Sequence, residues 1–267
     1  MNVENFLKVS FDKFFKHQHP EAALRYLPVV SAIKKAKLQN SKILEVGSGS
    51  LGITPYLKKE IDAVDVDFSG PETNYVNKID GSAEKLPFRK NQYDVVIAVD
   101  VLEHLSKNIR PHSIFEILRV ARKLVVIVVP VGKLSGEQDK NLDNLWQKTF
   151  GTRNQFLYEH VKNGLPTVEE ILVTVDKSLR KLGKKAKISS SPNLNLFVRY
   201  LLMKTWITRN RYIYYLYMKG YLLLVPILRL VNFGNCYRRI FVIEFLAPQK
   251  LPLEMSMNNS EKSRGKV

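Results

Sequence analysis

Apolar residues occur in short, nearly continuous runs in the first half of the chain, at residues 43–46, 93–99 and 124–130. A more interrupted run spans residues 60–67 and ends in acidic residues. Continuous apolar runs of this length are typical of parallel strands that are buried on both faces of a sheet. We therefore predict one strand in each of the four runs.

The segments between these runs carry apolar residues at helical spacing. They predict helices at residues 3–16, 21–38, 110–123 and 194–231, and two more within residues 136–183 after a polar loop. The second of these two begins after Pro166, where Thr167 and Glu170 have the spacing of a capping box. Two further strands are predicted at residues 185–191 and 237–247. Strands that alternate with helices indicate an α/β fold.

This order of elements divides the chain into a core and its additions. A helical cap precedes the core, and a basic, aromatic helical segment interrupts it before the last strand. The polar C-terminal tail is predicted to be disordered. The divisions are the cap at residues 1–40, the core at 41–193, the helical insertion or lid at 194–236, the final core strand at 237–247 and the tail at 248–267.

The first apolar run leads directly into a glycine-rich turn, with the sequence ILEVGSGSLG at residues 43–52. Glycines in such a turn allow positive φ angles and close approach of a ligand, and the following helix offers unpaired N–H groups at its start. The spacing also fits a dinucleotide-binding loop. Glu45 favours a different ligand, because a carboxylate just before the first glycine would repel a pyrophosphate. A cation such as the sulfonium of S-adenosylmethionine would be attracted by it.

Acidic residues follow at the spacing that a ribose requires. Asp65 lies at the end of the second predicted strand, 18 positions after Gly47. An acid about 20 residues beyond the glycine turn can accept hydrogen bonds from both ribose hydroxyl groups. Asp67 is the alternative acid of the pair.

Two later stretches belong to the same crevice. Residues 80–88, DGSAEKLPF, form a polar loop that is suited to holding an adenine edge. The strand at residues 93–99 is followed by Asp100, Glu103 and His104. In an open α/β sheet, ligands bind beyond the carboxyl ends of the strands, so these side chains are expected beside the glycine turn.

The four stretches ILEVGSGSLG, AVDVDFS, DGSAEKLPF and YDVVIAVDVLEHL resemble, in order and spacing, the motifs of the class I S-adenosylmethionine-dependent methyltransferases. The resemblance covers about residues 41–131. It implies a Rossmann-like, mostly parallel seven-stranded sheet flanked by helices, with N-terminal helices and a C-terminal helical insertion before the last strand. It also implies an enzyme that uses S-adenosyl-L-methionine as its cofactor.

The resemblance implies roles for individual residues. The acid and glycines of the first motif line the methionine part of the cofactor, and the acid after the second strand holds the ribose. The polar loop lies against the adenine. The acid after the strand at residues 93–99 closes the methionine side. In that order the residues are Glu45, Gly47, Ser48 and Gly49; Asp65 and Val66; Ser82 and Ala83; and Asp100. The sequence departs from the family at Leu51, where Gly is common, and at Ser82, where Asp is common.

The expected reaction is direct in-line transfer of the methyl group to an oxygen or nitrogen atom of a small-molecule, glycan or lipid-linked acceptor. Alignment of donor and acceptor supplies most of the acceleration. A hydroxyl acceptor benefits from a base, and His104 is the candidate, because the ordinary histidine pKa of about 6.5 suits proton removal near neutrality. Methylation of nucleobase amino groups or of cytosine C5 is not expected, because the Asn-Pro-Pro-aromatic motif is absent and Cys236 is in neither a Pro-Cys nor a Thr-Cys context.

Three alternatives stay open at this point. An RNA methyltransferase would use a basic segment to follow phosphates. A binding protein could keep the fold and the cofactor without chemistry. A nicotinamide-dependent dehydrogenase would use the glycine turn, although Glu45 argues against it. No metal site is predicted, because His17, His19 and His112 lack metal-ligand spacing with nearby Cys or carboxylates.

Composition fits one principal domain. A chain of 267 residues with 45% apolar residues can bury a full α/β core. Cys236 is the only cysteine, which excludes an internal disulfide and fits a reducing compartment. Residues 1–20 contain no continuous apolar core, so we expect no secretory signal and a cytoplasmic location.

Positive charge is concentrated late in the chain. Residues 180–247 contain 13 basic residues and one acidic residue, a net charge of +12. Within them, a stretch rich in tyrosine and leucine is too interrupted for a membrane span, which needs roughly 20 apolar residues. We predict that this segment is a helical lid. Its cations either stay in water or contact an anionic membrane, in which case the protein lies peripherally on the inner membrane surface. A nucleic-acid partner is less expected.

Overall fold

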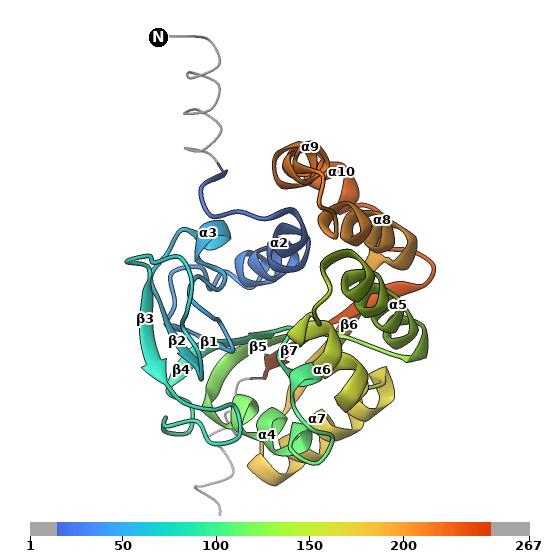
Figure 1. Cartoon of the computed structure of the whole chain (residues 1–267). Coiled ribbons are helices and arrows are strands. Elements are labelled where there is room, and N and C mark those ends of the chain that lie inside the picture. Colours follow the sequence, from blue (N-terminus) through green and yellow to red (C-terminus); the bar gives the residue numbers. More distant parts are fainter. Residues whose placement is uncertain (1–14, 247–267) are drawn as a thin grey trace, which may run out of the picture.

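Seven strands form a single mixed sheet in the computed structural model, which describes residues 15–246 (Figure 1). The strand order is β3-β2-β1-β4-β5-β7-β6. Strands β1 to β5 are parallel, and β7 runs antiparallel to both β5 and β6. The predicted Rossmann-like, mostly parallel seven-stranded sheet is confirmed. The strands are β1 Ile43–Val46, β2 Ile61–Asp65, β3 Val76–Asp80, β4 Tyr93–Val99, β5 Ala121–Pro130, β6 Ala186–Asn195 and β7 Cys236–Phe245.

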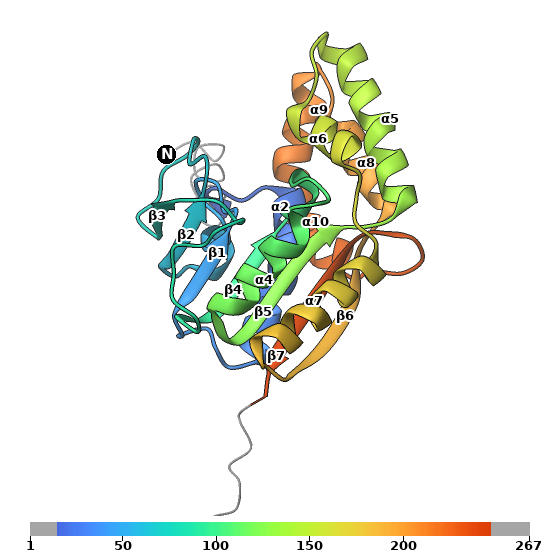
Figure 2. The same cartoon turned by 90° about the horizontal axis from the view of Figure 1, so that it is seen from below.

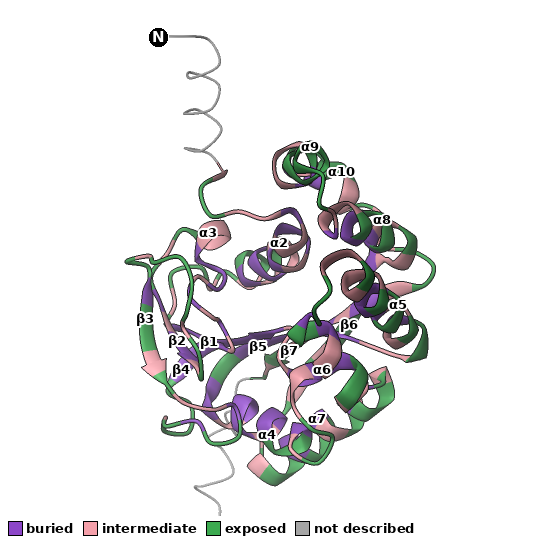
Figure 3. Ribbon diagram, viewed as in Figure 1, coloured by how far each residue is buried: buried purple, intermediate pink, exposed green. Residues whose placement is uncertain are grey.

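The strand order reverses between β1 and β4. From β1 the chain moves outward to β2 and β3, and then returns to place β4 on the other side of β1. Every residue of β1 and β4 is buried (Figure 3), which explains their continuous apolar sequences. Ligands of open α/β sheets bind beyond the carboxyl ends of the strands at such a switch point. The ends of β1, β2 and β4 therefore mark the expected site.

Helix α2 (Pro20–Lys35) covers one face of the sheet. Its residues Val29 and Ile33 are fully buried and pack with Ile43 and Val95 of the central strands. Pro20 occupies the first turn, where its missing N–H costs no hydrogen bond.

Helices α4 (Arg110–Val120) and α7 (Val168–Leu182) cover the opposite face (Figures 1 and 2). Ile117 of α4 and Val175 of α7 are buried in one cluster with Val96 of β4. The alternation of neighbours along β4, with Val95 facing α2 and Val96 facing α4, shows that the sheet is covered on both sides.

A third group of helices stands beyond the carboxyl ends of the strands (Figure 2). Leu142, Leu157 and Met203 join three of these helices in one apolar cluster, and Leu202 and Leu222 pack with Leu24 of α2 in another. The group consists of α5 (Lys133–Phe150), α6 (Gln155–Asn163), α8 (Leu196–Trp206), α9 (Arg211–Tyr215), the π-helical turn η2 (Leu216–Gly220) and α10 (Tyr221–Leu228). Two short elements, α3 (Thr54–Leu57) and η1 (Leu102–His104), follow β1 and β4.

Several boundaries differ from the sequence prediction. The single helix expected at residues 194–231 is divided into α8, α9, η2 and α10, and β6 takes the first two residues of that range. Helix α5 begins at Lys133, where a polar loop was predicted. Strand β3 was not predicted, because it is an edge strand in which only Val76 is buried.

Strand β5 also begins earlier than predicted, at Ala121 rather than residue 124. Its charged start is stabilised by Asp94 of β4, whose Oδ1 lies 2.5 Å from Arg122 and 3.3 Å from Lys123. The predicted helix at residues 3–16 falls mostly, and the disordered tail at 248–267 entirely, outside the described residues.

The capping box of α7 gives a prediction for stability. The Thr167 hydroxyl accepts a hydrogen bond from the Glu170 amide at 3.1 Å, and the Glu170 carboxylate accepts one from the Thr167 amide at 2.7 Å. Thr167→Ala should lower the free energy of unfolding by about 1 kcal/mol in urea titration. Thr174→Ala is the matched control, because Thr174 is half-buried in the same helix, its hydroxyl donates to the Glu170 carbonyl rather than to the cap, and Ala is the better helix former. Equal losses in both variants would contradict a specific role for the cap.

Candidate active site

A cleft of about 940 Å³ opens at the carboxyl ends of β1, β2 and β4. The glycine turn after β1 and the ends of β2 and β4 form one side of it. Side chains from α2, α6, α8 and β7 complete its walls. All of the predicted cofactor residues except Glu45 line this cleft, and so does His104.

The glycine turn needs its glycines for two different reasons. Gly47 and Gly52 have φ angles of +72° and +51°, and a Cβ at either position would overlap neighbouring side chains. At Gly47 the Cβ would lie 2.3 Å from Val101, and at Gly52 it would lie 2.2 Å from Glu45. Gly49, with φ +57°, has no atom within 4 Å of a built Cβ. Its backbone therefore borders open space in the cleft, where a ligand can approach closely.

Glu45 lies beneath the turn rather than in the cleft wall. Its carboxylate is fully buried, accepts a hydrogen bond from the Tyr26 hydroxyl at 2.9 Å and another from the Ile53 amide at 2.7 Å. Burial raises the pKa of Glu45 to about 7, despite these two hydrogen bonds. The side chain expected to contact the methionine part therefore holds the shape of the turn instead.

Asp65 connects the end of β2 to the glycine turn. Its Oδ2 accepts a hydrogen bond from the Gly49 amide at 2.6 Å, and its Oδ1 accepts one from the Val66 amide at 2.6 Å. Val66 itself is 80% exposed at the cleft. Asp67 binds the backbone and hydroxyl of Ser69 two residues later. Asp65 is thus the acid of the pair that faces the turn, and its predicted contact with a ribose stays a prediction.

The loop after β3 lies against the same side of the cleft. Gly81, Ser82 and Ala83 all line it. The Ser82 hydroxyl accepts a hydrogen bond from the Glu84 amide at 3.2 Å, so it is partly engaged within its own turn. The loop is therefore placed for an adenine edge through its backbone as well as through Ser82.

Asp100 forms a buried ionic network at the end of β4. It accepts hydrogen bonds from Arg25 of α2 at 2.8 Å and from Arg238 of β7 at 2.6 to 2.9 Å, and Glu21 pairs with Arg238. Burial alone would raise the pKa of Asp100, but Arg238 and Arg25 outweigh it and hold that pKa well below its usual range. Arg25, Arg238 and Glu21 were not predicted, because they are far from Asp100 in the sequence.

A second polar cluster occupies the other end of the cleft. His104 Nδ1 lies 2.7 Å from Glu159, and His104 Nε2 lies 3.5 Å from Nε2 of His160. Burial lowers the pKa of His104, and the nearby His160 lowers it further. His160 Nδ1 lies 2.9 Å from Asp139. His104 is therefore in the cleft as predicted, but its partners on α5 and α6 were missed.

Glu103 is the third member of this cluster. Its side chain is fully buried, and neither carboxylate oxygen has a hydrogen-bond partner on another described residue. Burial, with added repulsion from Asp100, raises the pKa of Glu103 well above its usual range. The sequence contains one signal for these partners, the adjacent Glu159 and His160 on an amphipathic helix, but no local spacing links them to His104.

Residues 44–129 match the family model of the methyltransferase domain. This segment contains the glycine turn, Asp65, the polar loop and β4, and it ends within β5. The chain carries a class I S-adenosylmethionine-dependent methyltransferase domain. The predicted enzyme class and cofactor are confirmed.

Solved methyltransferase structures are similar to this chain over most of its length. One is a possible histamine N-methyltransferase from Thermotoga maritima, with 16% identity, 84% of this chain and 90% of that chain covered, and a TM-score of 0.48. Another is the magnesium protoporphyrin IX methyltransferase from Synechocystis PCC 6803 with bound SAH, with 14% identity, 82% and 81% covered, and a TM-score of 0.46. No curated protein matches the chain.

The methyltransferase site gives a prediction for pH dependence through Glu45. Its pKa is raised from 4.5 to about 7, so the folded state binds this proton more tightly than the unfolded chain does. The contribution of Glu45 to stability therefore falls as pH rises from about 4.5 to about 7, by an amount on the order of 3 kcal/mol. In Glu45→Gln the amide oxygen can accept from Ile53, and the amide NH₂ can donate to the Tyr26 hydroxyl oxygen in place of the bond that Tyr26 donates. Without the charge, this variant should gain stability relative to wild type between pH 5 and pH 8.

Urea unfolding of both proteins at the two pH values measures this difference. Glu84→Gln, on an exposed side chain, is the control and should change the free energy of unfolding by less than about 0.5 kcal/mol at either pH. A constant difference between Glu45→Gln and wild type would show that the carboxylate is charged throughout.

Proposed function

We propose that this methyltransferase transfers the methyl group of S-adenosylmethionine to an oxygen or nitrogen atom of a small-molecule, glycan or lipid-linked acceptor. The observation that carries the proposal is the single cleft that extends from the glycine turn and Asp65 to His104. It is large enough for a cofactor and an acceptor to lie in one continuous space, since ligand pockets commonly measure about 300 to 1,000 Å³.

The cofactor half of the cleft fits the parts of S-adenosylmethionine. Gly47, Ser48 and Gly49 lie against the methionine part, and the open space beside Gly49 leaves room for it. Asp65 accepts three backbone hydrogen bonds, and a carboxylate has about four lone-pair sites, so about one site is left for a ribose hydroxyl group. Arg25, 28% exposed in the cleft wall, supplies a cation for the methionine carboxylate, and Asp100 holds that arginine in place.

The acceptor half has aromatic and histidine side chains in its walls. Phe156 of α6 lies edge-on to His104, with ring centroids 5.6 Å apart, and Trp206 of α8 and Tyr217 of η2 line the same space. Such walls suit an acceptor with a flat or apolar portion. S-adenosylmethionine supplies an activated methyl group, so the chain's own task is to orient the acceptor and exclude water. Because the pKa of His104 is lowered, its imidazole is neutral at pH 7 and can contact a hydroxyl group of the acceptor.

The segment from α8 to α10 supports contact with an anionic membrane. Tyr212, Leu223, Ile227 and Leu230 are between 61% and 77% exposed, although each is large and apolar. Residues 194–236 contain six basic residues and no acidic residue. No helix among the described residues is long and apolar enough to cross a membrane. A large apolar surface with cations and no acids fits a peripheral position on a negatively charged inner membrane surface, with a lipid-linked acceptor.

Loss of the Asp65 carboxylate tests the cofactor half. Asp65→Ala should weaken S-adenosylmethionine binding by roughly ten- to 150-fold in titration calorimetry, because charge-assisted hydrogen bonds are worth about 1.5 to 3 kcal/mol. Asp67→Ala is the matched control, since the side chain of Asp67 bonds only Ser69 in the described structure, and this variant should bind S-adenosylmethionine normally. Weak binding in Asp67→Ala alone would reverse this assignment.

An acceptor screen tests the transfer itself. Labelled S-adenosylmethionine is offered with hydroxyl and amine compounds, glycans and membrane lipid extracts, and we expect label in one or more of these classes. Label only in RNA would replace the proposed acceptors. Tight cofactor binding without transfer to any class would indicate a binding protein.

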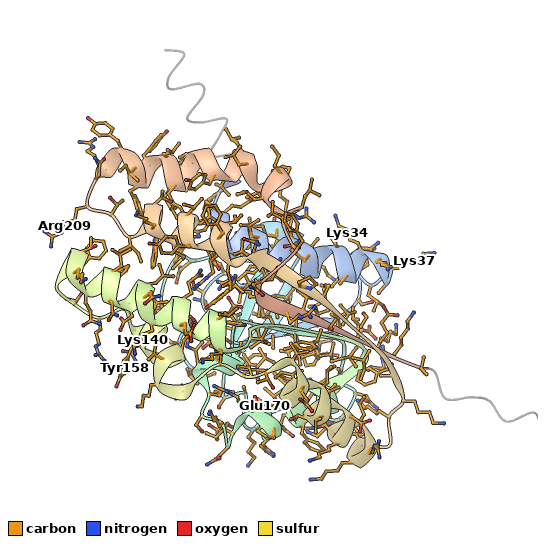
Figure 4. All side chains as sticks on the ribbon, turned by 90° about the vertical axis from the view of Figure 1, so that its right-hand side faces the viewer. Lys34, Lys37, Lys140, Tyr158, Glu170 and Arg209 are labelled. Atoms are coloured by element: carbon orange, nitrogen blue, oxygen red, sulfur yellow. The ribbon has the colours of Figure 1, made fainter. Side chains whose placement is uncertain are left out.

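Cosedimentation with vesicles tests the membrane contact. Arg209 points outward from the turn between α8 and α9, at the opposite end of the molecule from Lys34 of α2 (Figure 4). Each cation near an anionic surface contributes about 1 kcal/mol, so Arg209→Ala/Arg211→Ala should lower partitioning roughly thirtyfold at low salt. Lys34→Ala/Lys35→Ala removes the same charge and should have little effect. Equal losses in both double variants would indicate a nonspecific effect of net charge.

A further inference from the structure

Glu103, His104 and His160 bring three metal-ligand atoms together in the acceptor half of the cleft. One side-chain atom from each residue lies within 4.8 Å of the other two. All three residues line the cleft, and Glu103 and His160 are buried. No metal site was predicted from the sequence, in which His160 lies 56 residues from His104 and no local spacing joins the two.

Outer carboxylates determine where each imidazole carries its proton. A carboxylate accepts hydrogen bonds, so Nδ1 of His160 donates to Asp139 at 2.9 Å. In the same way, Nδ1 of His104 donates to Glu159 at 2.7 Å. With one proton per neutral ring, both Nε2 atoms present lone pairs. These two lone-pair atoms face each other across 3.5 Å, with no hydrogen available for a bond between them.

Glu103 adds a third acceptor to the same place. Its Oε1 lies 4.0 Å from Nε2 of His160, and both of its oxygens lack a hydrogen-bond partner on another described residue. The neighbouring guanidinium groups of Arg25 and Arg238 bind Asp100 instead. A buried carboxylate without a partner is costly. Two nitrogen lone pairs and a buried carboxyl group without a partner converge here, and a cation would stabilise this arrangement.

From this geometry we propose that Glu103, His104 and His160 bind one divalent transition-metal ion. Two nitrogens bound at about 2.0 to 2.1 Å in a tetrahedral site lie roughly 3.4 Å apart, which agrees with the separation of the two Nε2 atoms. Imidazole ligands favour Zn²⁺, Fe²⁺, Ni²⁺ or Cu²⁺ over Mg²⁺ and Ca²⁺, and the carboxylate of Glu103 also suits Mn²⁺. Asp139 and Glu159 complete the site as outer partners that orient the two imidazoles.

The ion would determine the acceptor class. Two histidines and one carboxylate leave a coordination position open, and His104 borders the cleft from which an acceptor would reach it. A hydroxyl group at that position loses its proton to water in the cleft more readily. The oxygen then donates an electron pair to the methyl carbon, the C–O bond forms, and the C–S electron pair returns to sulfur. This step rests on the proposed methyl transfer, and it makes the acceptor a hydroxyl compound and His104 a ligand.

Metal binding is measured first, without catalysis. Full-length protein stripped with a chelator and titrated with Co²⁺ should bind one ion per chain in calorimetry and develop the visible absorption of a low-symmetry site. Glu103→Gln and His160→Ala should each weaken binding at least tenfold, and His112→Ala, an exposed histidine on α4, should not. Circular dichroism checks that each variant is folded. No binding by wild type, or equal binding by wild type and Glu103→Gln, would overturn the site.

Two further readouts separate the site from the methyl transfer. Catechol, a probe with two hydroxyl groups, should change the Co²⁺ absorption of wild type, and an unchanged spectrum would overturn the open position. In the acceptor screen, transfer to hydroxyl compounds should fall after stripping and return with Zn²⁺ or Mn²⁺. Transfer that persists without metal would overturn the catalytic role of the ion while leaving the proposed function intact. Metal binding without S-adenosylmethionine binding would overturn the proposed function alone.

Discussion

The ionic contact of Asp100 with Arg25 and Arg238 is the interaction on which the cleft depends. It connects the first described helix, the end of the central strand and the last strand of the sheet. Asp100 has a φ of +54°, a conformation that costs about 1 to 3 kcal/mol in a residue other than glycine. The two guanidinium groups offset that cost, and removal of either one would leave the buried Asp100 carboxylate with only one of its two cationic partners. Cofactor half and acceptor half meet at this point.

The buried carboxyl groups of Asp100, Glu45 and Glu103 differ in whether a cation stabilises their charge. Asp100 is charged and paired, whereas Glu45 and Glu103 have raised pKa values because burial is not matched by a cation. Glu45 is satisfied by two hydrogen-bond donors and shapes a turn. Glu103 has no such donors. Two buried carboxylates near one cleft therefore have different physical roles, which their sequence contexts do not distinguish.

The parts of the site that were predictable are those encoded by local spacing. Gly47 follows β1, Asp65 ends β2 and His104 lies in the short η1 turn after β4, and parallel strands bring their carboxyl ends to one edge. The carboxylate of Glu45 lies beneath the turn and outside the cleft wall, a placement that spacing could not give, because spacing does not tell which face of the loop a side chain occupies. Arg238 and His160 depend on strand pairing and helix packing over 138 and 56 residues, which no local pattern records.

The cofactor half and the acceptor half of the cleft come from different parts of the chain, and this separation affects how the acceptor specificity can change by substitution. Everything that shapes the cofactor half, apart from α2 and β7, is complete by the end of β5 at Pro130. Most walls of the acceptor half come from α6, α8 and η2, and an apolar cluster joins α6 and α8 to each other and to α5. Substitutions in these helices could alter which molecules are modified without disturbing the turn beneath the cofactor. The late helices therefore form a separately variable module, through which one transfer reaction can be directed to new acceptors.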